Sequence, residues 1–198
     1  MIPVNLAVED ALSEAVLRKM LAGCGREYAV GTSYSRGGFG YLKRTIGGFN
    51  NAAKGVPFLV LADLDAGTCP ADLISAWLPR PKHHNLLFRV AVREVEAWVL
   101  GDRNAITSYL GVSDQPIPPD VDAIADPKRL LIDLARMSRR RDIREDLVPS
   151  TNSTRQVGPG YNYRMSAFVR DFWSAPRAAL HSRSLDRALR AVKTFTPK

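Results

Sequence analysis

The sequence predicts an α/β fold with a mainly parallel sheet, helices on both faces and a C-terminal helical extension. Short apolar runs of strand length alternate with stretches of helical periodicity as far as residue 111. The run over 57–62 is apolar throughout, as expected for a parallel strand buried on both faces. After residue 111 this alternation stops. We therefore expect an α/β core over 1–111 and a basic, mainly helical extension over 112–198 that packs on the core.

In the core, four apolar runs predict strands, and the stretches between them predict helices. Strands are expected over 4–8, 27–34, 57–62 and 86–92. Helical spacing is found over 9–23 and 71–78, and over 93–111 as one helix or a helix pair. Residues 35–55 begin with the glycine-rich stretch SRGGFG, which predicts a loop running into a helix.

The extension is predicted to start with an irregular, proline-rich connection over 113–128. An amphipathic pattern predicts a helix over 126–138, followed by the charge run RRRDIRE and a polar loop over 150–162. Two further helices are expected over 163–174 and 184–195. In this region the side chains that could stack on bases are Tyr161, Tyr163, Phe168 and Trp173. Phe168 and Trp173 have near-helical spacing, which more often indicates core residues.

The composition is that of a globular protein, with 45% hydrophobic and 24% charged residues among 198. No apolar run approaches the roughly 20 residues of a membrane span, and the first residues lack the features of a signal peptide. These observations predict a soluble, cytoplasmic protein without a membrane partner. The two cysteines, Cys24 and Cys69, have no metal-binding spacing and are expected to be reduced thiols.

The positive charge is concentrated in the last third of the chain. Residues 1–127 hold 12 Lys and Arg against 14 Asp and Glu, whereas residues 128–198 hold 16 against 6. This asymmetry favours a nucleic-acid partner, DNA or RNA, over a surface that is basic only for solubility. Candidate contacts to phosphate are Arg36 and Lys43 by the glycine-rich loop, and Arg139, Arg140 and Arg141 with Lys128 nearby. A plain connecting loop and a solvated charge run are the alternatives.

Three acids follow the predicted strands at their carboxyl ends. Asp63 and Asp65 end the third strand and Glu9 ends the first. Ligands of parallel sheets bind at this edge, so the three carboxylates converge if the two strands are neighbours. Their mutual repulsion would be relieved by a hard divalent cation, and Mg²⁺ prefers carboxylate oxygens and water. For a single acid, a helix cap or turn is the alternative.

The motifs LAVED and FLVLADLDAG resemble those of the Toprim domain, over roughly residues 4–110. The resemblance implies Mg²⁺-dependent phosphoryl transfer on nucleic acid, with Glu9, Asp63 and Asp65 as catalytic and metal-binding residues. Gly67 stands where many Toprim proteins have a further Asp, so one metal or two remain open. Glu94 and Glu96 follow the fourth strand and are candidates to replace that acid. We prefer Glu96 as the metal ligand, with Glu9 either a ligand or the group that handles a proton.

Across nearly the whole chain, the sequence also resembles a group of small bacterial Toprim-like proteins associated with phage-defence genes. The shared features are GGFGYLKR, RVAVREVEAWVLGD, DPKRLLIDLA, GPGYNYRMSAFVRDFW and SLDRAL. This resemblance implies an effector role in bacterial defence and says little about chemistry. The Toprim resemblance implies a nuclease that uses Mg²⁺ or Mn²⁺, and a separate ATPase partner is expected because larger relatives of the Toprim nucleases carry an ATPase in the same chain. The alternative is a non-catalytic module that keeps the fold and binds nucleic acid or a protein partner.

Overall fold

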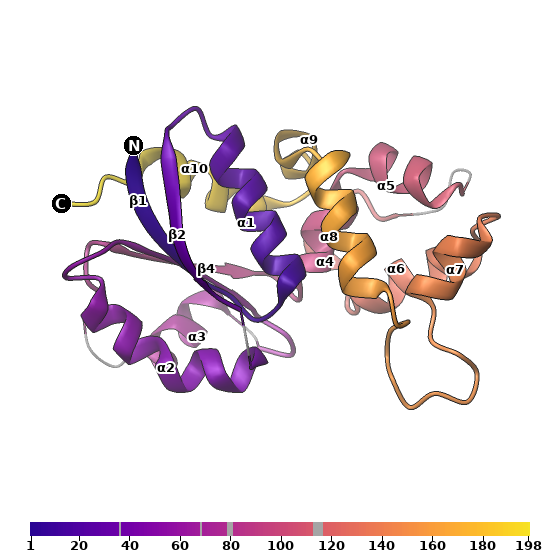
Figure 1. Ribbon diagram of the computed structural model, residues 1–198, viewed down its shortest axis with the longest axis horizontal. Helices are drawn as coiled ribbons and strands as arrows, with labels where there is room; N and C mark the ends of the chain where they lie inside the picture. Colours follow the sequence, from indigo (N-terminus) through magenta and orange to yellow (C-terminus); the bar gives the residue numbers. More distant parts are fainter. Residues whose placement is uncertain (36, 68, 79–80, 113–116) are drawn as a thin grey trace.

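Four parallel strands form one sheet at the centre of the α/β part (Figure 1). The computed structural model describes residues 1–35, 37–67, 69–78, 81–112 and 117–198. The strands are β1 (Ile2–Ala7), β2 (Tyr28–Tyr34), β3 (Phe58–Asp63) and β4 (Leu86–Ala91), in the order β2-β1-β3-β4. The α/β fold is confirmed, and β1 and β3 are the two inner strands.

Helices alternate with these strands as the periodicity predicts. They are α1 (Ala11–Gly23), α2 (Gly38–Ala52), α3 (Pro70–Trp77), α4 (Val95–Gly101) and α5 (Arg103–Leu110). Residues 93–111 therefore contain a helix pair. The end of the glycine-rich stretch, from Gly38, forms the first turn of α2. The helix begins after Gly37, which is in the left-handed region (φ 111°), where glycine carries no steric cost.

The C-terminal region is helical, as expected. Its elements are η1 (Val121–Ala123), α6 (Pro127–Arg136), α7 (Arg141–Leu147), α8 (Tyr161–Asp171), α9 (Ala175–Ala179) and α10 (Arg183–Thr194). Helix α7 lies where the sequence suggests only a charge run. It forms because Ile143 and Leu147 are buried on one side, while Arg141 pairs with Glu145 one turn along the other.

Successive residues of β3 point to opposite faces of the sheet, and both faces are covered. Phe58 and Val60 pack in a cluster with residues of α2 and α3. Leu59 and Leu61 belong to a larger cluster that contains residues of α1 and of helices α6 to α10. Since α8 packs on α1 and α10 on β4, the extension shares one hydrophobic core with the sheet.

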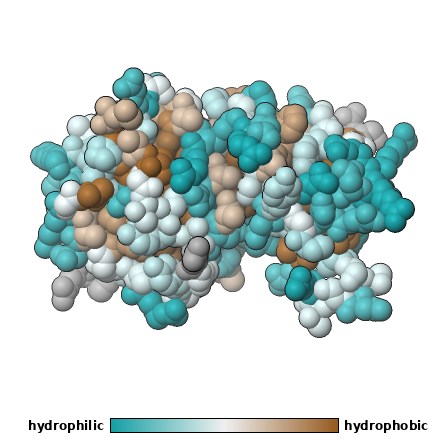
Figure 2. Space-filling view, viewed as in Figure 1, coloured by the Kyte–Doolittle hydropathy of each residue, from teal (hydrophilic) through white to brown (hydrophobic). Residues whose placement is uncertain are grey.

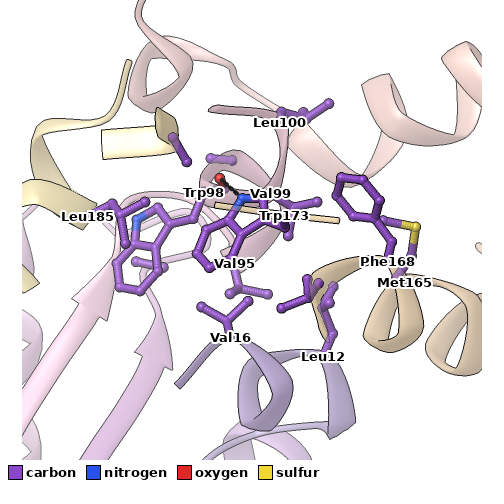
Figure 3. Packing of buried hydrophobic residues seen from close by; sticks show 14 of the residues in the cluster. Leu12, Val16, Val95, Trp98, Val99, Leu100, Met165, Phe168, Trp173 and Leu185 are labelled. Atoms are coloured by element: carbon purple, nitrogen blue, oxygen red, sulfur yellow. Dashed lines mark hydrogen bonds between the residues drawn. The ribbon is translucent and has the colours of Figure 1, made fainter. Parts of the chain in front are cut away.

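Two tryptophans lie at the centre of this larger cluster (Figure 3). Trp98 and Trp173 are fully buried, and the indole N–H of Trp173 donates to the carbonyl oxygen of Trp98 at 3.1 Å. The indole N–H of Trp98 donates to the hydroxyl of Ser184 at 2.6 Å. These bonds satisfy both buried donors and join α4 to the C-terminal helices.

Among the residues that the structure covers, no helix is long and apolar enough to cross a membrane.

Candidate functional site

Glu9 and Asp63 meet at the carboxyl edge of the sheet. Strands β1 and β3 pair in parallel, with Ala7 opposite Val60, so the chain leaves both strands at neighbouring points. The Oε1 atom of Glu9 accepts a hydrogen bond from the backbone N–H of Asp63 at 2.9 Å. The first and third strands are therefore neighbours in the sheet, which is the condition for their acids to converge.

Asp63 also caps a helix. Its Oδ1 atom accepts a hydrogen bond of 2.9 Å from the N–H of Val95, the first residue of α4. The side chain is buried, and only 9% of the residue is exposed. One carboxylate oxygen thus stabilises the start of a helix 32 positions further along the chain, which differs from the local cap or turn that is the alternative for a single acid.

Asp65 belongs to a turn with left-handed backbone. Its φ is 50°, and the φ of Arg93 opposite is 64°. The Asp65 N–H donates to the Arg93 carbonyl at 2.8 Å, and the Arg93 guanidinium donates to the Asp65 carbonyl at 3.0 Å. Such conformations cost roughly 1–3 kcal/mol at residues other than glycine and tend to cluster at functional sites. The turn leaves the Asp65 side chain exposed at the mouth of the site.

The acids after β4 share a lysine from the C-terminal region. The Nζ atom of Lys128 lies 3.0 Å from Oε1 of Glu94 and 3.5 Å from Oε1 of Glu96. The backbone N–H of Lys128, in the first turn of α6, donates to Oε2 of Glu94 at 3.0 Å. Glu94 therefore stabilises the start of α6, where a negative charge is favoured by the helix dipole.

Glu96 is the most deeply buried acid of the site, with 1% of the residue exposed. Its Oε1 atom accepts a 2.9 Å hydrogen bond from the hydroxyl of Tyr161, which is itself buried at the start of α8. Its Oε2 atom is buried and has no hydrogen-bond partner among the described residues. Nothing in the sequence links Tyr161 or Lys128 to these acids, because both come from distant helices of the extension.

Burial dominates the electrostatics of the site. It raises the pKa of Glu9 to about 7, with further contributions from Asp65 and Asp10. Burial and the charge of Glu96 raise the pKa of Asp63 well above its usual range. Burial and the charge of Glu94 raise the pKa of Asp65.

Lys128 only partly offsets the burial of Glu96. Burial raises the pKa of Glu96 to about 7 even though the ammonium of Lys128 lowers it. For Lys128 itself, burial lowers the pKa, but the charges of Glu96 and Glu94 outweigh burial and raise it. The site is therefore a cluster of acids that cannot all ionise easily, with one cation at its side.

The arrangement suits a hydrated cation better than a closed metal cage. Within the described part of the chain, no group of three or more His, Cys, Asp or Glu side chains is placed to hold a metal ion by itself. Mg²⁺ does not need such a cage, because it keeps several waters and binds one or two carboxylates together with substrate phosphate. The unpartnered Oε2 of Glu96 and the neighbouring Asp63 fit that mode.

A cavity of about 570 Å³ lies beside Asp65 and Glu94 of this cluster. It is lined by residues of the turn after β3, of the segment after β4, of α6 with the residues before it, and of the loop between α7 and α8. The lining consists of Asp65, Ala66, Arg93, Glu94, Ala125, Asp126, Lys128, Arg129, Ile132 and Gln156.

The basic residues predicted to bind nucleic acid do not come together. Lys43 is exposed on α2, which belongs to the α/β part, whereas Arg139, Arg140 and Arg141 lie at the start of α7 in the C-terminal region (Figure 1). Arg36 lies outside the described residues.

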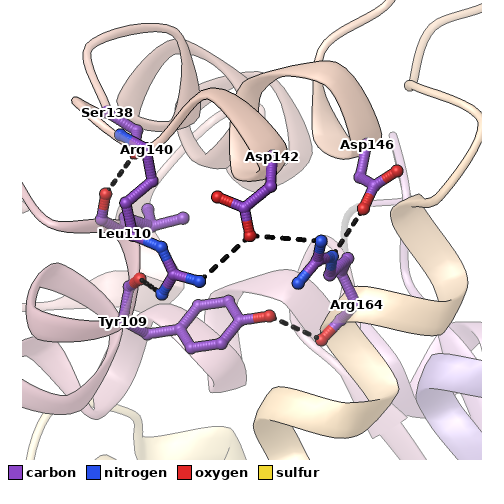
Figure 4. Close-up of polar contacts among 7 residues, drawn as sticks. All are labelled: Tyr109, Leu110, Ser138, Arg140, Asp142, Asp146 and Arg164. Atoms are coloured by element: carbon purple, nitrogen blue, oxygen red, sulfur yellow. Dashed lines mark hydrogen bonds and ion pairs between the residues drawn. The ribbon is translucent and has the colours of Figure 1, made fainter.

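Two of the three arginines before and in α7 already have acidic partners. Arg140 pairs with Asp142, which also pairs with Arg164 of α8 (Figure 4). Arg141 pairs with Glu145. These ion pairs stabilise α7 and hold it against α8, so the charge run contributes to the structure.

Most of the aromatic residues near the C-terminus are core residues. Tyr161, Phe168 and Trp173 are buried, whereas Tyr163 is 77% exposed. The preference for a core position is confirmed for Phe168 and Trp173, and Tyr163 is the one member of this set with an exposed ring.

Fold and site together define an α/β protein with a four-stranded parallel sheet, a C-terminal helical region and an acidic cluster at the carboxyl edge. No family profile, curated protein or solved structure matches the chain.

Proposed function

We propose that this protein is a Mg²⁺-dependent nuclease of Toprim-like architecture that hydrolyses phosphodiesters at the acidic cluster. One observation carries the proposal: acids follow the ends of three neighbouring strands, and the charges of Glu9 and Glu96 both raise the pKa of the buried Asp63 between them. Burial raises the pKa of Glu9 and of Glu96 as well. Carboxyl groups whose pKa values are raised by burial and by neighbouring charges are typical of functional sites. The Toprim-like motifs around Glu9 and Asp63 also favour Mg²⁺-dependent phosphoryl transfer on nucleic acid.

The residues divide into separate roles. Asp63 and Glu96 would hold the cation together with water molecules, and the charge of Asp65 at the mouth of the site would favour it further. When bound, the cation would neutralise substrate charge and activate water. Glu9 has a pKa of about 7, so near neutral pH its carboxylate can accept a proton from the attacking water. Water then adds to phosphorus, the ester P–O bond breaks, and the leaving oxygen takes up a proton.

Asp65 provides a clean test of this function. Asp65→Asn removes the charge but keeps the size, and asparagine tolerates the φ of 50° at this position. Labelled DNA and RNA, each single-stranded and duplex, would be incubated with Mg²⁺ or Mn²⁺. We expect cleavage by the wild type and a loss of about 100-fold or more in the variant. Asp72→Asn, an exposed acid in the first turn of α3, is the matched control and should cleave normally.

A second candidate is favoured by Lys128. Its ammonium lies against Glu94 and Glu96, and thus supplies a positive charge where a cation would otherwise be required. In that case the protein is a binding module for nucleic acid or a protein partner. Nucleic-acid binding that is unaffected by EDTA, with no cleavage and no Mn²⁺ binding, would favour the module over the nuclease. A role in phage defence and a separate ATPase partner stay predictions from the resemblance.

A further inference from the structure

The cavity beside the acids lies between the two parts of the chain. One wall is the turn with Asp65 and Ala66, and the other includes Arg129 of α6 and Gln156 of the loop between α7 and α8. In Figure 1 this loop projects from the C-terminal region, and Figure 2 shows the surface indented between the loop and the α/β part. A ligand in the cavity would therefore contact both parts of the protein.

Two guanidinium groups of this cavity are available to a phosphate. Arg93 donates to the carbonyl oxygens of Asp65 and Gly67, and takes part in no ion pair within the described residues. Arg129 shares the carboxylate of Asp133 with Arg136, so one negative charge faces two positive ones. Arginine in such a position binds phosphate oxygens well, because its planar donors match their geometry.

Asp63 and Glu96 are buried and do not line the cavity, whereas Arg129 is exposed and lines it. Of the clustered acids, Asp65 and Glu94 line the cavity. A phosphodiester would therefore have to pass these two acids and descend below the protein surface to reach Asp63 and Glu96. A duplex is stiff and holds both strands paired, while a single strand bends and can present one phosphate at depth. The cavity volume of about 570 Å³ is in the range, roughly 300–1,000 Å³, of sites that hold a small ligand.

We propose that this cavity binds a single strand of nucleic acid, with Arg93 and Arg129 on phosphates that flank the reacting one and Gln156 on the strand from the opposite wall. The position of the reacting phosphate rests on the proposed function. Preferential binding of a single strand to the cavity does not, and it can be measured without cleavage.

Fluorescence anisotropy with one labelled oligonucleotide, single-stranded or annealed to its complement, tests the inference in EDTA and again in Ca²⁺. We expect the single strand to bind at least about tenfold more tightly than the duplex. Arg129→Ala should weaken single-strand binding about tenfold and reduce the salt dependence by about one phosphate contact. Gln156→Ala should weaken it about threefold.

Arg136→Ala is the matched control, because Arg136 lies on the same helix and pairs with the same Asp133 but does not line the cavity. It should bind as the wild type does. Equal or tighter binding of the duplex, or equal effects of the Arg129 and Arg136 changes, would overturn the inference. Single-strand binding that depends on Arg129, without cleavage in Mg²⁺, would uphold it while refuting the nuclease.

Discussion

The carboxylate of Glu9 accepts a 2.9 Å hydrogen bond from the backbone N–H of Asp63, a residue 54 positions further along the chain. This contact joins the carboxyl ends of the two inner strands. It also means that Glu9 contributes to the structure through one oxygen, whatever its second oxygen does. Any test of its chemistry must therefore keep the hydrogen bond and remove the charge.

Glu9→Gln meets this requirement, because the amide oxygen can accept the same hydrogen bond. We expect the variant to fold normally and to unfold at an equal or higher temperature near neutral pH, since a partly buried charge is removed. If Glu9 takes the proton from water, cleavage should fall by about 100-fold or more. Glu9→Ala, which leaves the Asp63 N–H without this acceptor, should also lose stability, by about 1–3 kcal/mol. Full cleavage by Glu9→Gln would show that Glu9 is a structural residue.

The raised pKa values of Glu9 and Glu96 predict how stability depends on pH. Both rise from 4.5 to about 7 in the folded protein, which therefore holds more protons than the unfolded chain in that interval. The stabilisation is complete below about pH 4.5 and is lost as the pH rises through about 7. Without metal, we expect the midpoint of thermal unfolding to fall by roughly 5 °C between about pH 5 and about pH 8.

Mg²⁺ should flatten this pH dependence, because a bound cation favours the ionised acids. Glu96→Gln should remove part of the dependence without metal, as its neutral amide does not titrate. The prediction is wrong if the midpoint rises over this interval, or if the variant and the wild type have the same pH profile.

Lys128→Met removes the ammonium between Glu94 and Glu96. A neutral side chain leaves two partly or fully buried carboxylates without their cation, and the free energy of unfolding should fall by about 2–3 kcal/mol. Chemical denaturation measures the loss, and Lys128→Arg, which keeps the charge, is the control. If the site binds Mg²⁺, the ion should restore more stability to Lys128→Met than to the wild type. A loss that Mg²⁺ does not reduce would favour the non-catalytic module.

Tyr161→Phe deletes the hydroxyl that fixes Glu96 and keeps the buried ring. The Oε1 atom of Glu96 would lose a donor in a buried place, so we expect a loss of about 1–2 kcal/mol in unfolding free energy. The carboxylate would also be less firmly oriented, and Mn²⁺ affinity measured by calorimetry should fall several-fold.

Tyr163→Phe tests the same chemical change two positions away, on a ring that is 77% exposed. It should leave both stability and Mn²⁺ affinity unchanged. Equal behaviour of the two variants would contradict a positioning role for Tyr161.

The four strands and the acids that follow them could be predicted from the sequence, because both signals are local. The apolar run before Asp63 is typical of a buried strand, and the position of Glu9 directly after another strand is visible in the same way. Sequence also predicts that an acid after β4 belongs to this edge. The sequence did not predict the short helices α7 and α9, since 7 and 5 residues are too few to show a helical period.

Tertiary structure alone decided which residues surround those acids. Lys128 and Tyr161 reach Glu96 from helices of the C-terminal region, and no local pattern records such long-range contacts. The pairing of β1 with β3, which brings Glu9 to Asp63, likewise depends on strand order. The sequence by itself thus determined where acidic side chains leave the sheet. Folding determined how deeply they are buried and which charges face them, and these two quantities govern their chemistry.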